Sequence, residues 1–258
     1  MIEVGISDAG GKVKASKNDK YLQVEEFLRL LIPSLNAAIE AGHIDKPDEK
    51  SPLTIVDLGC GHAYLTFAAH QYLRNEGIAV KVIGIDIRES ARIRNNEIAK
   101  KLGIEKSIEF RAEEISETTL KNADVAIALH ACDTATDDAL GWSVTTGAKL
   151  VLVAPCCHHD IQAQMVEIPE PWSMITKNGI MKERLGDLIT DGLRIQIMKL
   201  SGYRVEAIEF IGGEHTPRNL MIRAVKTGAV ADPSEEKRYQ EMISLWKVKP
   251  ALATLLNR

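Results

Sequence analysis

The sequence predicts a doubly wound α/β fold, in which a seven-stranded sheet is parallel over five strands and ends in an antiparallel hairpin. The first observation is that short apolar runs alternate with segments of helix length, and strand–helix–strand repeats make parallel sheets covered by helices on both faces. The second is a pair of strand-like runs whose connection is too short for a crossover helix, so they should pair antiparallel. The parallel runs are residues 54–58, 80–85, 107–111, 124–129 and 149–154, and the hairpin runs are residues 204–210 and 220–225.

The helical segments divide the chain into three parts. Residues 1–18 are rich in Gly, Ser and Lys without periodicity and are expected to form a mobile arm. Residues 19–228 form the main domain, which opens with an amphipathic helix over residues 19–42. Residues 229–258 form a helical tail that Pro250 interrupts. Further helices are expected near residues 63–75, 88–102, 114–121, 134–145 and 181–201.

Composition limits the classes of function. The chain has 258 residues and a formal net charge of −4, so a nucleic-acid partner would need a local basic patch rather than overall charge. Its four cysteines are too few for a disulfide framework and are read as thiols. No apolar run is long enough to span a bilayer, and the N-terminus lacks a signal pattern, so we expect a cytoplasmic protein without membrane contact. The sequence carries no signal for an oligomeric state.

The turn that follows the first strand is the first candidate binding element. Asp57 ends an apolar run and is followed by Gly59 and Gly61. Glycine is suited to a sharp turn or to close approach of a ligand. The dinucleotide fingerprint would need a third small residue where Tyr64 stands. A strand-to-helix turn of any α/β protein remains the plain alternative.

Acidic residues follow the second and third strands. Asp86 could accept both hydroxyl groups of a ribose, or it could cap the helix that begins near Ile87. Glu113 and Glu114 follow the third strand and could bind a ligand or cap the next segment. Because ligands of doubly wound sheets lie beyond the carboxyl ends of the strands, these positions should face one site.

Taken together, these strand ends resemble those of class I S-adenosylmethionine-dependent methyltransferases, over residues 50–226. The resemblance implies the Rossmann-like methyltransferase fold, S-adenosylmethionine as cofactor, and an acid after the third strand that contacts the adenine amino group. The cofactor-binding residues it implies are Asp57, Gly59, Cys60, Gly61, Asp86, Ile87, Glu113, Glu114 and His130.

Two reactive motifs follow the fourth and fifth strands. They read His-x-Cys-x-x-Ala-Thr-Asp at residues 130–137 and Cys-Cys-His-His at residues 156–159. They resemble motifs of the acceptor-stem tRNA 2′-O-methyltransferases, the methyltransferase-like 25 group and the methyltransferase domain of the glutathione S-transferase C-terminal-domain protein. This resemblance implies RNA (tRNA or rRNA) as the methyl acceptor. The chain departs from those families at Asp133, where they have glycine, and lacks the zinc-finger regions of the tRNA enzymes.

Three chemical interpretations of these motifs compete. His130 or His158 could take the proton of a nucleophile, since histidine titrates near neutral pH. Cys132 or Cys156 could attack a pyrimidine ring covalently, as in RNA 5-methylcytosine enzymes. The cluster could also bind zinc, with His130 or Cys132 contributing from across the strands. Four adjacent residues cannot easily face one ion and Cys-x₂₋₄-Cys spacing is absent, so no metal is expected. Packing cysteines are the plain alternative. The candidate catalytic residues are His130, Cys132, Asp133, Cys156 and His158.

Charged residues elsewhere suggest contacts to the acceptor. In residues 181–201, four charged side chains share one helix face, which is expected to be solvated and ion-paired or else to border the substrate. Arg218 and Asn219 could hold the substrate or close the hairpin turn. The charged face comprises Arg184, Asp187, Asp191 and Arg194, and the candidate basic surface comprises Lys12, Lys14, Lys17, Lys20, Lys177, Lys182 and Arg184.

Three functions therefore follow from the sequence. Methylation of RNA by direct transfer is favoured on resemblance. A protein or small-molecule acceptor is the second, and a non-catalytic, S-adenosylmethionine-binding regulatory domain is the third.

Overall fold

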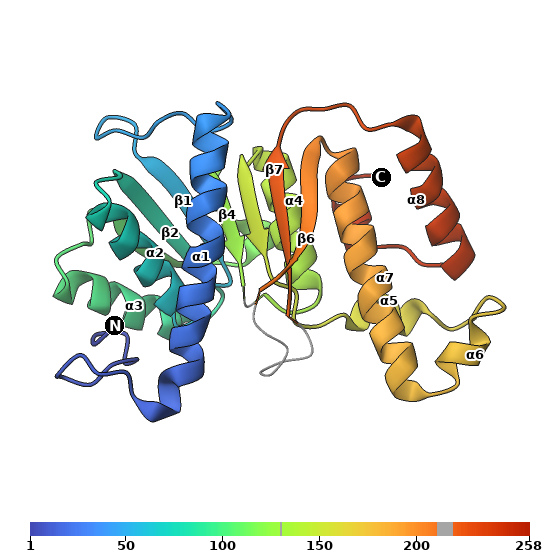
Figure 1. Cartoon of the computed structure of the whole chain (residues 1–258), viewed down its shortest axis with the longest axis horizontal. Coiled ribbons are helices and arrows are strands. Elements are labelled where there is room, and N and C mark those ends of the chain that lie inside the picture. Colours follow the sequence, from blue (N-terminus) through green and yellow to red (C-terminus); the bar gives the residue numbers. More distant parts are fainter. Residues whose placement is uncertain (130, 211–218) are drawn as a thin grey trace.

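The computed structural model describes residues 1–129, 131–210 and 219–258, which form one seven-stranded sheet with the order β3-β2-β1-β4-β5-β7-β6 (Figure 1). The neighbours from β3 to β5 pair in parallel, and β7 pairs antiparallel with both β5 and β6. The predicted topology is thereby confirmed. The strands are β1 (Leu53–Leu58), β2 (Val80–Asp86), β3 (Ile108–Ala112), β4 (Val125–Ala128), β5 (Leu150–Val153), β6 (Tyr203–Glu209) and β7 (Leu220–Lys226).

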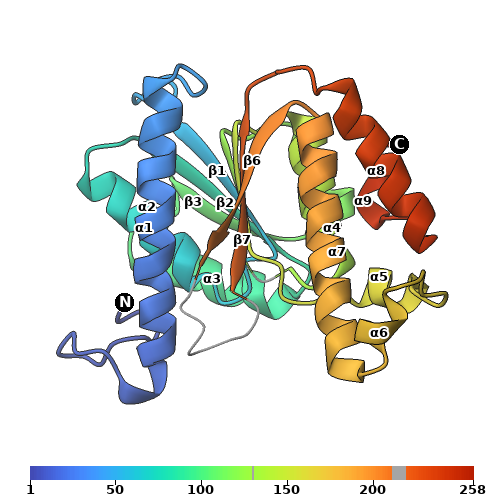
Figure 2. The ribbon, with the colours of Figure 1, turned by 45° about the vertical axis from the view of Figure 1, so that its right-hand side comes forward.

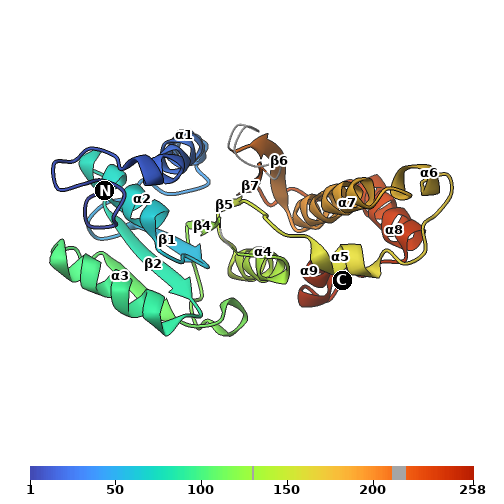
Figure 3. The same cartoon turned by 90° about the horizontal axis from the view of Figure 1, so that it is seen from below.

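Helices cover both faces of the sheet, and Figure 3 shows α1 and α4 on opposite sides of it. One apolar cluster joins α1, α2 and α3 to the sheet, and a second joins α4, α5 and α7 to its other face. The helices are α1 (Asn18–Glu40), α2 (Tyr64–Asn75), α3 (Glu89–Lys101), α4 (Thr134–Thr146), α5 (His159–Gln164), α6 (Ser173–Thr176), α7 (Gly179–Leu200), α8 (Pro233–Trp246) and α9 (Ala251–Leu255).

The strands of the parallel half are buried on both faces because each side carries helices. Every residue of β4 and β5 is buried, which explains their continuous apolar sequences. The register pairs Leu58 with Ile85 and Asp86 with Ala112, so the ends of the first three strands lie at one edge of the sheet. The order changes direction between β1 and β4, and this is where ligands of such sheets bind.

The first 17 residues differ from the expected mobile arm. Ile6 is 1% exposed and belongs to the core cluster of α1 and α2, and Glu3 forms an ion pair with Lys101. Asp8 holds this segment in a turn by accepting hydrogen bonds from the backbone N–H groups of Gly10 and Lys12. A short 3-10 turn (Ala15–Lys17) then leads into α1. The segment is therefore folded against the domain.

The helix expected near residues 114–121 is also absent from the structure, which has only a 3-10 turn there (Ile115–Glu117). Thr118 leaves this turn with an extended backbone. The segment contains Ser116, Thr118 and Thr119, and such residues have low helix propensity because they lose side-chain freedom or compete for backbone hydrogen bonds. In this connection, Ile115 and Leu120 pack against the apolar cluster on the α4 face of the sheet.

The C-terminal tail packs on α4 and α7, as Figure 2 shows for α8 beside α7. Tyr239 and Trp246 of the predicted apolar stripe are buried, whereas Met242 is exposed. Asp232 caps α8 by accepting a hydrogen bond from the Ser234 N–H at 2.7 Å. Nowhere in the described ranges is there a helix with the length and apolar character that crossing a bilayer requires.

Candidate active site

The turn after β1 brings the backbone close to the neighbouring strand ends. Gly59 and Gly61 have φ angles of +80° and +55°, which L-residues rarely adopt. The N–H groups of Gly59 and Cys60 both donate to the Ile85 carbonyl oxygen, at 2.8 and 2.9 Å. A Cβ atom on Gly59 would lie 3.5 Å from that of Ala131. The turn is therefore anchored to β2 and lies against the segment that follows β4.

Asp86 connects this turn to the end of β2. Its carboxylate accepts hydrogen bonds from the Gly61 N–H at 2.8 Å and the Arg88 N–H at 3.0 Å. The Arg88 guanidinium donates two more, at 2.8 and 3.0 Å. Burial would raise the pKa of Asp86, but these four donors outweigh it and the pKa lies below its usual value. Asp86 does not cap α3, whose N-cap is Arg88, so the capping alternative is excluded.

A cavity of about 460 Å³ lies beside these groups. The structure places five of the predicted cofactor residues in its wall: Gly59, Asp86, Ile87, Glu113 and Glu114. Cys132, predicted as a catalytic residue, also lies in this wall, whereas the other lining residues were not predicted from the sequence, although Ala135 and Asp138 follow β4 at helical spacing, which was an available signal. These other residues are Arg88, Ile115, Ser116, Ala131, Ala135 and Asp138.

The polar groups of this cavity fit an adenosine moiety. The Glu113 Oε2 atom is buried and has no hydrogen-bond partner among the described residues. A buried acceptor without a partner costs free energy, so it favours a ligand that brings a donor, such as the adenine amino group. The Arg88 side chain is exposed, so it could move into solvent and leave the Asp86 carboxylate to ribose hydroxyls.

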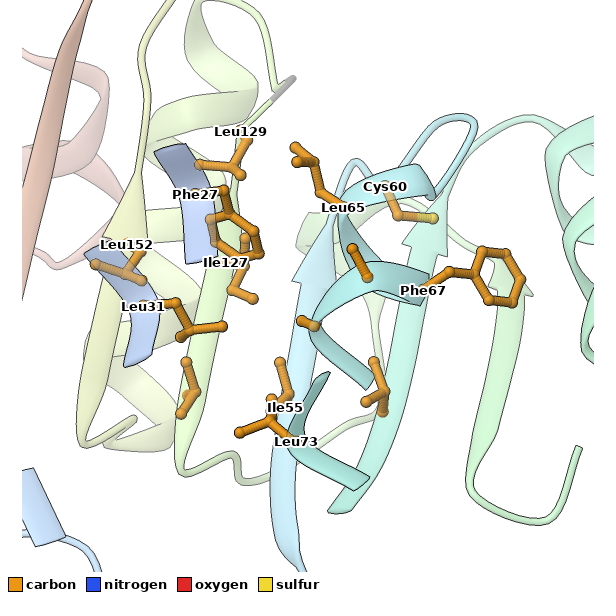
Figure 4. Packing of buried hydrophobic residues seen from close by; sticks show 14 of the residues in the cluster. Phe27, Leu31, Ile55, Cys60, Leu65, Phe67, Leu73, Ile127, Leu129 and Leu152 are labelled. Atoms are coloured by element: carbon orange, nitrogen blue, oxygen red, sulfur yellow. The ribbon is translucent and has the colours of Figure 1, made fainter. Parts of the chain in front are cut away.

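Asp57 and Cys60 lie behind the wall of the cavity rather than in it. The Cys60 side chain is buried in the core, on the side of the turn that faces Phe67 (Figure 4). Asp57 is buried too and accepts a hydrogen bond from the Thr66 hydroxyl of α2. Both side chains pack in the core and support the turn on the side away from the cavity. Burial raises the pKa of Asp57 to about 7, a rise that Thr66 opposes and the nearby Asp86 charge increases.

The titration of the Asp57 carboxyl group should make the free energy of unfolding fall as pH rises. Its pKa is about 3.9 in an unfolded chain, so between about pH 4 and pH 7 only the folded state holds the proton. An Asp57→Asn variant lacks this titration. We expect its free energy of unfolding, relative to the unmodified protein, to increase by about 2.5 kcal/mol from pH 5 to pH 8, since about two of the three pH units between the two pKa values lie in this interval. Urea unfolding at both pH values measures this difference, and an equal difference at both would contradict the raised pKa.

The reactive motifs bring three thiols together. The Sγ atoms of Cys132 and Cys156 are 3.1 Å apart, and those of Cys156 and Cys157 are 3.8 Å apart. All three lie within 4.8 Å of one another, and none is in a disulfide. Burial, followed by the neighbouring Cys132 and Cys157, raises the pKa of Cys156 to about 12. A thiol with that pKa is a poor nucleophile at neutral pH, which argues against covalent attack by Cys156.

Asp133 stands where the families named above have glycine, and its backbone conformation is one that glycine favours. Its backbone has φ +50° and ψ −120°, which is a conformation that glycine adopts readily and other residues adopt at a cost of about 1–3 kcal/mol. Its side chain accepts a hydrogen bond from the Asp160 N–H at 3.2 Å, and its carbonyl oxygen accepts one from Arg194 at 2.9 Å. These contacts hold the strained turn between Cys132 and α4.

His158 lies in a buried network rather than beside the thiols. Its Nε2 atom is 2.9 Å from Asp191 Oδ1, and its Nδ1 atom is 3.3 Å from Asp187 Oδ1. Asp191 also pairs with Arg194 at 3.3 Å. Arg194 in turn donates to both oxygens of Asp137, at 3.1 and 2.7 Å. The helix face expected to be solvated is therefore partly buried, because His158 and Asp137 from other elements cover its C-terminal half.

A second cavity of about 750 Å³ adjoins the thiols. Cys156 and His158 lie in its wall together with three acids and one cation of α7. Asn219 also lines it and donates to Glu209 at 2.8 Å, whereas Arg218 and His130 lie outside the described residues. Because Cys132 lines the first cavity, the thiols mark the place where the two cavities meet. The charged lining residues are Glu183, Asp187, Asp191 and Arg184.

A group of cations lies on the other flank of the cofactor turn. Lys17, Lys20, Arg88 and Arg94 are close enough to His62 that, after partial burial, their charges lower its pKa. Arg94 also donates to the His62 carbonyl oxygen at 3.2 Å. We call Lys17, Lys20, His62, Arg88 and Arg94 the basic cluster. It contains Lys17 and Lys20 of the predicted basic surface, whereas Lys177, Lys182 and Arg184 lie at the α6–α7 end.

The doubly wound sheet, the glycine turn and the acids beyond β2 and β3 define the class I methyltransferase fold. Residues 19–164, more than half of the chain, match the family model described as a methyltransferase domain. The chain therefore belongs to this methyltransferase family, whose class I members use S-adenosylmethionine.

Several solved methyltransferase structures are similar to the chain at low sequence identity. Magnesium protoporphyrin IX methyltransferase from Synechocystis PCC 6803, with bound S-adenosylmethionine, is 12% identical, with 84% of this chain and 86% of that chain covered and a TM-score of 0.51. Ribosomal protein L11 methylase from Lactobacillus delbrueckii subsp. bulgaricus is 13% identical, with coverages of 81% and 79% and a TM-score of 0.46. Geranyl diphosphate C-methyltransferase from Streptomyces coelicolor A3(2) is 13% identical, with coverages of 75% and 77% and a TM-score of 0.44. No curated protein sequence matches the chain significantly.

Proposed function

We propose that this protein transfers the methyl group of S-adenosylmethionine to RNA. The observation that supports the RNA assignment is the basic cluster beside the cofactor turn, where a chain of net negative charge could contact phosphates. The motifs at residues 130–137 and 156–159 support it through their resemblance to the acceptor-stem tRNA 2′-O-methyltransferases and the methyltransferase-like 25 group.

The cofactor residues have distinct tasks in this proposal. Asp86 binds the ribose hydroxyls, and Glu113 accepts a hydrogen bond from the adenine amino group. The glycine turn lets the backbone approach the ligand closely. When bound, S-adenosylmethionine supplies an electrophilic methyl group on its sulfonium. Holding donor and acceptor in line is then the main contribution of the chain to the rate.

The acceptor lies in the second cavity, where His158 is the candidate proton acceptor. Asp191 holds its Nε2 atom and would stabilise the imidazolium that forms. Its Nδ1 atom lies 3.3 Å from Asp187 Oδ1 without forming a hydrogen bond among the described residues. The acids Glu183, Asp187 and Asp191 could accept hydrogen bonds from exocyclic amino groups of a base that enters this cavity.

Incorporation of labelled methyl groups tests the proposal. We expect label from S-adenosylmethionine to enter total RNA when the full chain is incubated with it. Label found only in protein or small molecules would contradict the RNA assignment, and label in none of these would favour a non-catalytic binding domain.

Charge reversal in the basic cluster tests its contact with phosphates. We expect a Lys17→Glu, Lys20→Glu variant to bind RNA more weakly and its log–log salt slope to fall by about 1.5, since each phosphate contact contributes roughly 0.7–0.9. Lys237→Glu on α8 is the matched control, because this lysine is exposed and lies away from the cofactor turn. An unchanged slope in the double variant would show that phosphates bind elsewhere.

A cationic small molecule or protein side chain is the second candidate acceptor. The observation that favours it is the second cavity, whose wall has three acids and one arginine. Such a lining attracts an amine and repels a phosphate. Label entering a protein or amine fraction, with no effect of the lysine reversals, would favour this candidate.

A further inference from the structure

We propose that Cys132, Cys156 and Cys157 form a zinc site at the junction of the two cavities. The inference does not depend on RNA being the acceptor. It rests on the convergence of three thiols from two separate strand ends, which the sequence spacing alone argues against.

The distances between the thiols suit one tetrahedral ion. With zinc–sulfur bonds of about 2.3 Å, tetrahedral ligands lie about 3.8 Å apart. Cys156 and Cys157 already show 3.8 Å, Cys132 and Cys156 show 3.1 Å, and all three sulfurs lie within 4.8 Å of one another. An ion at their centre requires sulfur shifts below about 1 Å. The adjacent Cys156 and Cys157 can therefore bind one ion together, although all four residues of the Cys-Cys-His-His sequence were not expected to face one ion.

The backbone after Cys132 fixes the position of this thiol. Asp133, directly after Cys132, holds a strained conformation that Arg194 and the Asp160 N–H maintain, so the position of Cys132 is fixed at an energetic cost. Asp138 lies in the same cavity wall as Cys132 but does not belong to the cluster. Cys132 is exposed, which gives an ion a path to the site.

The site differs from the ligand set that the motif suggests. His158 of the Cys-Cys-His-His sequence is held by Asp191 and is not a ligand. Within the described residues, no other histidine, cysteine or carboxylate belongs to the cluster. Three thiolates leave the fourth tetrahedral position for another ligand. Each thiol must lose its proton when the ion binds, so binding releases protons and weakens as pH falls.

Metal analysis of the full chain, purified under reducing conditions, tests the inference. We expect about one zinc ion per chain. After metal removal, Co²⁺ should give a near-ultraviolet thiolate-to-metal charge-transfer band that zinc abolishes. Cys132→Ser and Cys157→Ser should each weaken binding by more than the roughly 10- to 100-fold typical of changes beyond the metal ligands. Cys60→Ala is the matched control, since Cys60 is the cysteine in the core, and it should keep the band.

The readout is independent of methyl transfer, so failure of the RNA proposal would leave it unaffected. Cys132 is exposed, and circular dichroism of Cys132→Ser establishes whether that variant folds. Absence of both stoichiometric zinc and the Co²⁺ band from the reduced, folded protein would overturn the inference. So would a band that persists unchanged in Cys132→Ser, and a stable disulfide between Cys132 and Cys156 under the same conditions.

Discussion

Replacing Asp86 by alanine is expected to weaken S-adenosylmethionine binding by about 10- to 100-fold. A hydrogen bond to a charged group contributes about 1.5–3 kcal/mol, and each 1.4 kcal/mol is tenfold in affinity. Asp86 is the carboxylate in the cavity wall that lies at the end of β2, where it can exchange the exposed Arg88 for ribose hydroxyls. Isothermal titration calorimetry with both proteins measures the change.

Two controls separate ligand contact from support of the turn. Asp86 also accepts the Gly61 N–H, so Asp86→Asn, which keeps one acceptor oxygen, should bind with intermediate affinity. Glu89→Ala removes an exposed carboxylate paired with Arg92 at the start of α3, outside the cavity, and should bind normally. Equal affinity of Asp86→Ala and the unmodified protein would refute the ribose assignment.

The cofactor half of the site could be read from the sequence because its signals are local. Gly59 and Gly61 are needed by the backbone of one turn, and Asp86 and Glu113 follow directly from the ends of their strands. Strands buried on both faces have continuous apolar sequences, so their ends can be located within a residue or two. The prediction of a helix near residues 114–121, after β3, was wrong, because hydroxyl-bearing residues stop the helix after one turn.

The acceptor half depends on contacts between distant parts of the chain. The spacing of Asp187, Asp191 and Arg194 predicted a shared helix face, but whether that face is solvated depends on His158 and Asp137. Four adjacent residues were not expected to face one ion, whereas the turn at Asp133 brings Cys132 to Cys156 and Cys157. Sequence periodicity cannot predict these contacts, because they depend on how two strand ends and α7 are placed relative to one another.

Replacing Arg194 by methionine should lower the free energy of unfolding by about 3–5 kcal/mol, because it leaves buried carboxylates without their cation. Arg194 is 2% exposed and pairs with Asp137 and Asp191. For a domain of this size, the loss corresponds to a fall in Tm of roughly 6–20 °C. Thermal and urea unfolding measure it. Arg184→Met on the same helix is the matched control, since Arg184 is exposed and its replacement should cost less than about 0.5 kcal/mol.

A second substitution, at Asp137, distinguishes two causes of the lost stability: a carboxylate left without its cation, or lost packing around Arg194. Adding Asp137→Leu to Arg194→Met removes the buried carboxylate as well, and a buried pair replaced by apolar side chains is often neutral in stability. We therefore expect the double variant to recover most of the loss, and a double variant less stable than the single one would contradict this explanation. Because Arg194 also holds the Asp133 carbonyl, the recovered protein should still position Cys132 poorly. Its thiols should then bind Co²⁺ more weakly than those of the unmodified chain, which connects the buried network to the reactive end of the site.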